Sequence, residues 1–488
     1  MMTAAQRKLV WILILVVFVC GAGLSESLKK GHDEYQRAAL AIDPKDFRDD
    51  TGTRSVLRAT PFQTLLPTLL GVREVLASLM WVQTDHYFHT GEYRPIIRMV
   101  RQITAIDPHQ LDVYATGAWH MAYNFMDKRL IDDGVKFLEE GCKNNRTVYD
   151  LFFELGYMHY DKTKNFPEAV KHYTEAAEKG TTTGKKDPPA FVRHQLAHAM
   201  EKMGDIDAAV KQWDTNVTMA KELEKDGESI YGPASPNEAA AAHNLYITRR
   251  RMNERLAAAA ERNKNAAEAI QFWQANIDLA GKRLLESPGR TDIIKDQTVA
   301  KGQVERLKSG KLRDLPPTNP NIHFTVTRLA PRKLLVEGTI DVLELSRVNV
   351  RLEDEGYEQR AEDFNNKMND CTLEWENPSV RGGKFRHLFE LDKDPADMDR
   401  ASDTIYPLKA EKYTLTVTYD PRVMSAFIQD VYGWNGEGLT AKPDELVIDS
   451  SRSGVLAGKR IPLRYVRHSI TLKREDLLAS GKQELYKD

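Results

Sequence analysis

The sequence contains 488 residues, of which 41% are hydrophobic and 29% are charged, and its mean hydropathy is −0.51. This composition excludes a mostly disordered chain and a membrane protein with many spans, and the length predicts about two to four domains. Lys and Arg number 69 and Asp and Glu 71, so the net charge is −2. Because no overall basic field exists, nothing indicates binding to nucleic acid.

Residues 1–29 are predicted to form an N-terminal membrane anchor. The uncharged, apolar run Leu9–Leu24 is close to the length that a helix needs to cross a bilayer. Arg7 and Lys8 precede it, and positive charge at this end keeps the N-terminus in the cytoplasm and sends the rest of the chain across. The localisation that we expect is therefore the cell membrane, with a single span.

Two alternatives to an uncleaved anchor stay open. The short run ends in Gly21-Ala22-Gly23, as a cleaved signal peptide does, and Cys20 could be a lipidated cysteine. All three interpretations place residues 30–488 outside the cytoplasm, in the periplasm or on the cell surface. Residues 30–76 are expected to be a juxtamembrane helical segment.

Residues 77–286 are predicted to form an all-α solenoid of helix pairs. Apolar residues recur there at three- and four-residue spacing, which is typical of amphipathic helices. In each of four helix pairs, the second helix carries a small or apolar residue, a larger residue four positions later and a small or medium residue three positions after that. These triplets recur about every 35 to 40 residues. These triplets are Ile96-Val100-Ile103, Gly134-Leu138-Gly141, Ala169-Tyr173-Ala176 and Ala209-Trp213-Asn216. The first helix of each pair carries its own small residue, namely Thr84, Ala118, Gly156 and Ala197. Small residues let helices approach closely, and each pair must stack on the next to bury its apolar face.

With these residues the sequence resembles the tetratricopeptide repeat family. The motif Leu155-Gly156-Tyr157 followed by Phe166, Ala169, Tyr173 and Ala176 is the best match, and Leu196-Ala197 with Gly204-Asp-Ile and Ala209 is similar. Trp81, Gly91-x-Tyr93 and Asp107-Pro108 give a third unit. Leu70–Phe88 is similar to the first repeat of membrane-anchored bacterial proteins of this type. A longer helix pair, Asn237–Ala260 and Ala266–Leu285, is predicted to close the solenoid.

The resemblance implies a scaffold without enzymatic activity that binds protein partners in a groove lined by the first helices. The alternative is that the aromatic residues there pack between helices. The residues that would line the groove are Trp81, Asp85, His89, Trp119, Tyr123, Phe153, Tyr157, His194 and His198.

Residues 287–319 are rich in charges, Gly and Pro and are predicted to be a linker, part helical and part extended. After it the periodicity becomes two, so residues 320–475 are predicted to be an all-β sandwich and 476–488 a tail. The predicted strands are Ile322–Arg328, Lys333–Ile340, Val348–Leu352, Thr372–Trp375, Lys384–Leu391, Tyr413–Tyr419 and Ile461–Leu472. The run from Leu408 to Val417 resembles a late strand of immunoglobulin-like or fibronectin-type domains, which implies that architecture.

No catalytic or cofactor motif stands out, so we expect no cofactor and no enzymatic activity. His194 and His198 share one helix face and Glu201 follows them, but the solvated or groove-lining interpretation outweighs a metal site. Arg249–Arg251 is interpreted as an exposed helix face, with a lipid headgroup contact as a minor alternative. Gly433–Gly438 is interpreted as a turn cluster. The three cysteines, one of them Cys142, are too few for a disulfide framework.

Two other functions of the β region remain as alternatives. One is a metal-dependent hydrolase that uses His323, His387 and His468, although their spacing is unlike that of ligands. The other is a carbohydrate-binding protein in which Trp375 and Trp434 stack on sugars.

Overall fold

The computed structural model describes residues 73–90, 93–124, 130–182, 188–225, 238–313, 318–355, 373–391 and 408–488. They form two compact units. The first unit holds residues up to 163 together with 172–188, and the second holds 164–171, 189–391 and 408–488.

The predicted anchor, residues 1–29, lies outside the described residues, as does the juxtamembrane segment 30–76 up to residue 72. Over the part of the chain that the structure describes, no helix combines the length and the apolar character needed to cross a bilayer. Cys20 and Cys371 are also outside the described residues, whereas Cys142 is a buried free thiol.

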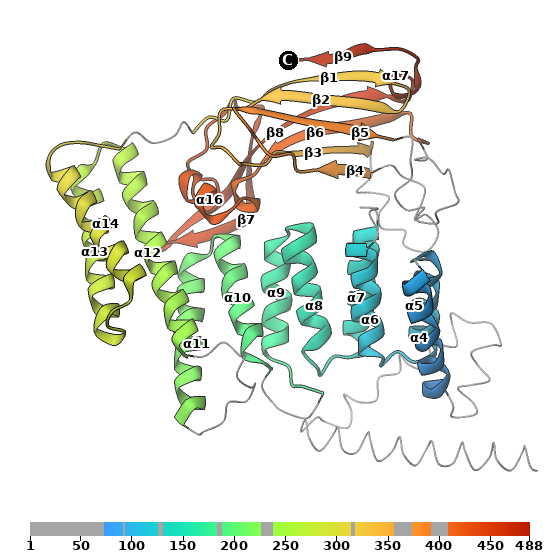
Figure 1. Cartoon of the computed structure of the whole chain (residues 1–488), viewed down its shortest axis with the longest axis horizontal. Coiled ribbons are helices and arrows are strands. Elements are labelled where there is room, and N and C mark those ends of the chain that lie inside the picture. The colour runs from blue at the N-terminus through green and yellow to red at the C-terminus, as the bar shows by residue number, and fades with distance from the viewer. Residues whose placement is uncertain are drawn as a thin grey trace, which may run out of the picture. The chain divides into compact units, whose positions relative to one another are not determined.

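The first unit is helical, and its successive helices pack side by side in chain order (Figure 1). The helices α6 and α8, each the first of its pair, are followed directly by the π-helical turns η1 and η2. The elements are α4 (Arg73–Thr90), α5 (Tyr93–Ile106), α6 (Leu111–Trp119), η1 (His120–Asn124), α7 (Leu130–Asn144), α8 (Asp150–Met158), η2 (His159–Thr163) and, in part, α9 (Phe166–Ala177).

Small residues set the close approach of these helices, as predicted. A Cβ atom on Gly156 would lie 2.7 Å from Cδ1 of Tyr173, so the tyrosine ring packs directly on the backbone of α8. A Cβ atom on Gly117 would lie 2.8 Å from Cε1 of Phe137. Both rings are buried. The predicted pattern of small residues facing large ones is confirmed.

The second unit also begins with helices that pack on one another in chain order. It comprises α10 (Ala190–Met203), α11 (Ile206–Lys225), α12 (Glu238–Arg262), α13 (Ala266–Glu286) and α14 (Thr291–Lys308). The predicted pair Asn237–Ala260 and Ala266–Leu285 corresponds to α12 and α13, which pack together, but this pair does not end the series of helices because α14 follows it and packs on α13. Residues 287–319 were predicted to be a linker that is part helical. The helical part is α14, but it packs on α13 and buries Ala300, Val304 and Leu307 with Trp273, so α14 is not a linker.

The β region consists of two antiparallel sheets (Figure 1). One has the order β5-β2-β1-β9 and the other β4-β3-β6-β8-β7. The strands are β1 (His323–Ala330), β2 (Lys333–Thr339), β3 (Asn349–Asp354), β4 (Leu373–Glu376), β5 (Lys384–Glu390), β6 (Lys412–Tyr419), β7 (Leu446–Leu456), β8 (Lys459–Lys473) and β9 (Gln483–Lys487). Every predicted strand is therefore present.

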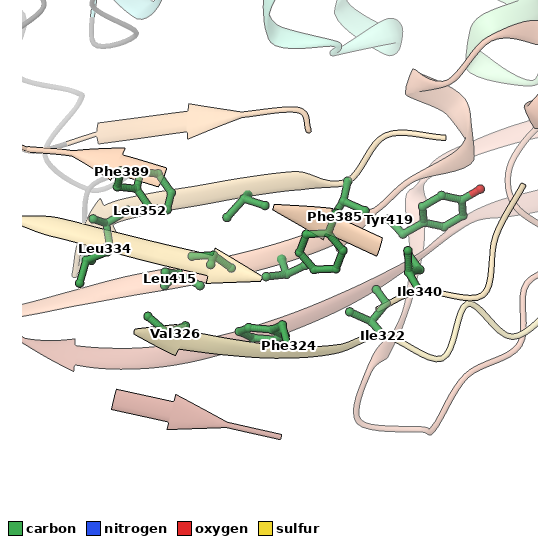
Figure 2. Packing of buried hydrophobic residues seen from close by; sticks show 14 of the residues in the cluster. Ile322, Phe324, Val326, Leu334, Ile340, Leu352, Phe385, Phe389, Leu415 and Tyr419 are labelled. Carbon is green, nitrogen blue, oxygen red and sulfur yellow. The ribbon is translucent and has the colours of Figure 1, made fainter. Parts of the chain in front are cut away.

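The two sheets share one apolar core, so the region is a sandwich. Alternate residues of each strand turn inward, such as Phe324 and Val326 of β1 and Leu415 and Val417 of β6. Figure 2 shows Phe324, Val326 and Leu415 among side chains of β2, β3 and β5 in this core. Period-two burial on both sheets is what a sandwich core requires.

Two strands were missed by the sequence prediction. The predicted tail 476–488 is wrong, because β9 within it pairs with β1 and extends the first sheet. The other is β7, which pairs with β8 at the edge of the second sheet. A further feature supports the β6 assignment: the Tyr413 hydroxyl accepts a hydrogen bond from the Ala410 backbone N–H at 3.1 Å. Such a contact resembles the tyrosine corner of immunoglobulin-like sandwiches.

Candidate partner-binding surface

The predicted groove residues of the first helix pair lie on α4. Trp81 is partly exposed. Asp85 and His89 are one turn apart, with 3.5 Å between Oδ2 and Nε2, and both side chains are 70% exposed. These two polar side chains are therefore open to solvent and to a partner.

Trp119 and Tyr123 form an aromatic pair where α6 passes into η1. Their rings are stacked, with centroids 5.9 Å apart, and Trp119 is 44% exposed. The Tyr123 hydroxyl donates to Oδ2 of Asp161 at 2.9 Å, and the Lys162 ammonium lies 3.6 Å from the Tyr123 ring centroid. Burial and then the Asp161 charge raise the pKa of Tyr123, so its hydroxyl stays a donor. The Tyr123 ring thus contacts both an indole and a cation.

The next first helix, α8, adds Tyr157, which is 38% exposed. Phe153 lies one turn earlier and is partly buried, because its ring packs on Tyr173 with centroids 5.4 Å apart. We call Trp119, Tyr123 and Tyr157 the aromatic face. Phe153 belongs mainly to the packing between helices.

Carboxylates lie beside the aromatic face. Burial and then the charge of Asp150 raise the pKa of Glu154 on α8. Burial raises the pKa of Asp150, and the charge of Asp112 on α6 adds to the rise. The charge of Glu154 also raises the pKa of Tyr123. Carboxyl groups of α6 and α8 therefore lie close enough to one another and to Tyr123 to shift each other's pKa.

The remaining predicted residues, His194 and His198, lie on α10 in the second unit. Both rings pack edge-on against Trp213, with centroids 5.0 and 4.9 Å away. His194 is only 8% exposed, and burial followed by the charge of His198 lowers its pKa to about 4. His194 is therefore a neutral packing residue, whereas the His198 side chain remains 41% exposed.

Glu201, considered as a third metal ligand, instead joins helices of the second unit. It accepts hydrogen bonds from Nε1 of Trp213 at 2.9 Å and from the Thr248 hydroxyl of α12. Burial by itself would raise the pKa of Glu201, but hydrogen bonds from His198, Thr248 and Trp213 lower it. Among the described residues, no group of His, Cys, Asp and Glu side chains is placed to hold a metal ion.

Within the second unit, the sandwich region covers a surface of the helices α10–α12. Trp434, which follows α16 (Ala426–Tyr432), is 2% exposed and packs with Ile206 of α11. The Arg255 guanidinium lies 3.4 Å from the Trp434 ring centroid. Asp430 of α16 accepts from Nε of Arg255 at 2.7 Å and from Nη2 of Arg251 at 3.0 Å. We call this set of contacts the sandwich anchor.

The end of α10 contributes the rest of the sandwich anchor. The Lys202 ammonium donates to the Met424 carbonyl at 3.0 Å and to Oε1 of Gln429 at 3.4 Å. Burial, followed by the charge of Arg251, lowers the pKa of Lys202 to about 8. Gly204 has a left-handed φ of 84°, and a Cβ atom on it would lie 2.3 Å from Oδ1 of Asn435. Only glycine fits both this conformation and this approach.

The sandwich anchor corrects three interpretations of the sequence. Gly433–Gly438 is a turn cluster, as predicted, with left-handed Gly433 and Gly436, but it also docks on helices. Trp434 is buried and cannot stack on a sugar. Arg249–Arg251 is not simply an exposed face, because Arg250 pairs with Glu254 at 2.8 Å and Arg251 with Asp430.

The histidines of the alternative hydrolase have separate environments. His323 Nδ1 lies 3.2 Å from Oδ2 of Asp488, His468 Nε2 lies 2.8 Å from the Tyr486 hydroxyl, and His387 packs on Phe389. They lie on β1, β8 and β5, and none of them belongs to a metal-binding group among the residues that the structure describes. Trp375 of β4 is partly buried.

No protein-family model and no curated protein matches this chain. Among solved structures, MamA is 14% identical over 49% of this chain and 98% of its own, with a TM-score of 0.25. The pilF protein of Pseudomonas aeruginosa is 15% identical over 49% of this chain and 95% of its own, with a TM-score of 0.25. The C-terminal part of a TPR repeat-containing protein from Cytophaga hutchinsonii is 15% identical over 56% of this chain and 98% of its own, with a TM-score of 0.29. Similarity at these levels says nothing about what this chain binds.

Proposed function

We propose that the chain is a non-enzymatic scaffold of the tetratricopeptide type that binds a protein partner on its first helices. The observation that carries this proposal is a contrast between helices. On the first helices, Trp119 is 44% and Tyr157 38% exposed, whereas the large rings of the second helices, Phe137, Tyr173 and Trp213, are almost completely buried. Exposed Trp and Tyr are typical of the energetic centres of protein interfaces.

The proposal also includes a location. Residues 1–29 would hold the chain in a membrane, and the rest would lie outside the cytoplasm, because Arg7 and Lys8 precede the apolar run Leu9–Leu24. The test is protease treatment of intact cells or spheroplasts, followed by detection of the C-terminus. Protection of the C-terminus until the membrane is dissolved would contradict this location.

The sandwich would supply a second contact surface on an immunoglobulin-like framework. The strand order β5-β2-β1 in one sheet and β4-β3-β6-β8 in the other, together with the Tyr413 contact, supports this architecture. Its contact with α10–α12 would hold this surface at a fixed place on the helices of the second unit.

Site-specific crosslinking tests the partner-binding function. A photoreactive residue is placed at Trp119 or Tyr157 of the full chain in its native membrane, and a matched residue is placed at Leu285, which is 85% exposed on α13. We expect one discrete adduct from the first two positions and none from the third. Trp119→Ala and Tyr157→Ala should reduce the recovery of that partner, whereas Leu285→Ala should not. Equal labelling from all three positions would contradict the proposal.

A further inference from the structure

The chemistry of the aromatic face indicates what kind of segment it binds. Asp112 and Trp119 are two turns apart on α6, and Glu154 and Tyr157 are one turn apart on α8, so each helix presents a carboxylate and an exposed ring together. α6 and α8 are neighbours in the helical array. The charges of Asp161 and Glu154 both raise the pKa of Tyr123.

No cation among the described residues pairs with Glu154. It makes neither an ion pair nor a hydrogen bond with any described residue, and it is half-buried. Burial and then the charge of another carboxylate, Asp150, raise its pKa. A half-buried carboxylate beside a like charge is destabilised, and a cation brought next to it would relieve that cost.

The face already holds one internal cation in the arrangement that a ligand would adopt. The Lys162 ammonium lies over the Tyr123 ring at 3.6 Å and within 3.7 Å of Oδ2 of Asp161. This contact shows that an ammonium group fits between a ring and a carboxylate on these helices. Trp119 and Tyr157 offer two further exposed rings, and Glu154 a further carboxylate, for which the described residues supply no such cation.

We propose that the aromatic face binds a basic segment of a protein partner, with Lys or Arg side chains lying against Trp119 and Tyr157 and paired with Glu154. This inference rests on the proposed function, because it names the partner chemistry of the same surface. The charge of the face excludes an acidic peptide and an anionic membrane surface as occupants, and an uncharged apolar segment would leave Glu154 unpaired. Cation–π contact and ion pairing both strengthen as water is excluded.

The experiment measures the binding of labelled peptides to the full-length protein by fluorescence anisotropy. The probes are peptides of Lys-Ala-Leu repeats and their matched forms with Gln or Glu in place of Lys. We expect the Lys peptide to bind at least about tenfold more tightly than the Gln peptide at low salt, and the advantage to shrink as salt is added. The Glu peptide should not bind.

Two variants connect this binding to the face. Glu154→Gln should weaken the Lys peptide roughly three- to tenfold with little effect on the Gln peptide, and Trp119→Ala should weaken it by a similar factor. Glu305→Gln, which removes the same charge from an exposed site on α14, is the control and should change nothing. Circular dichroism checks that Glu154→Gln is folded, and a neutral side chain is expected to be tolerated there because burial already disfavours the charge.

The outcomes separate the two proposals. If the Gln or Glu peptide binds as tightly as the Lys peptide, or if Glu154→Gln and Glu305→Gln behave alike, the basic-segment inference is overturned. The scaffold function would still stand if crosslinking from Trp119 captures a discrete partner. If the Lys peptide fails to bind, the inference is overturned whatever crosslinking shows.

Discussion

Removing the Asp430 carboxylate tests how firmly the sandwich anchor is built. In Asp430→Ala the Arg255 guanidinium loses contacts of 2.7 and 2.6 Å, and its side chain is only 3% exposed. Removal of one partner from a buried ion pair costs about 3–5 kcal/mol, because the other charge is left without compensation. Glu437 also acts favourably on the Arg255 charge, so we expect the lower end, about 3 kcal/mol.

The assay is urea unfolding of the full-length protein, followed by circular dichroism, for four proteins. Asp430→Ala should lower the free energy of unfolding by about 3 kcal/mol, and Arg255→Met added to it should restore part of the loss because the buried cation is gone. Glu286→Ala is the control. It breaks an ion pair with Arg283 of 2.8 Å in which the glutamate is 52% exposed, and should cost less than about 1 kcal/mol. If Asp430→Ala costs no more than Glu286→Ala, or if the double variant is the least stable, the reasoning is wrong.

Three further changes test other parts of the structure by the same unfolding assay. Gly156→Ala places a Cβ atom 2.7 Å from the Tyr173 ring and should cost about 1–3 kcal/mol; an unchanged or raised stability would contradict the packing described for α8 and α9. The Lys202 pKa is lowered from 10.5 to about 8, so between these pH values the unfolded chain binds more protons than the folded one, and stability should rise with pH. Lys202→Met should lack that rise, and an identical pH profile in both proteins would exclude the buried ammonium. Tyr413→Phe leaves the partly buried Ala410 N–H without its acceptor and should cost about 1 kcal/mol, whereas Tyr173→Phe, whose hydroxyl has no hydrogen-bond partner among the described residues, should cost less.

The helix pairs could be predicted because their signal is local. Residues three and four apart lie on one face of a helix, so the spacing of Ala169, Tyr173 and Ala176 states which face is buried without knowledge of the partner. The small residue Gly156 then indicates where the large ring fits. The same holds for the inward residues of β6, which alternate with outward threonines.

The packing of α14 into the helical region was missed although its signal was also local. Ile293, Ala300, Val304 and Leu307 lie on one face at helical spacing and are buried. The many charges, the glycines and the prolines that follow made the composition resemble a linker. In contrast, β9 is five residues long and too short for alternation to be distinguished from chance.

The environment of a side chain on a predicted helix was harder to foresee. His194 and His198 were both assigned to the groove, yet the first is buried and the second is partly exposed. Both rings contact Trp213 at similar distances, so that contact does not account for the difference in exposure. A spacing of four residues places two side chains on one helix face but does not say how deeply each is buried.

The sandwich anchor lay beyond the reach of the sequence because its partners are far apart in the chain. Nothing in Gly433–Gly438 indicates that Trp434 contacts Arg255, and nothing near Lys202 indicates acceptors more than two hundred residues later.

The sandwich anchor also changes where the domain boundary lies. Cutting the chain in the predicted linker would expose Trp434 and Ile206 to water and leave the buried Arg255 without Asp430. The helices α10–α12 and the sandwich are therefore joined by the same kinds of contacts that hold a core together, and the boundary that composition suggests between residues 286 and 320 is not a boundary between independent folding units.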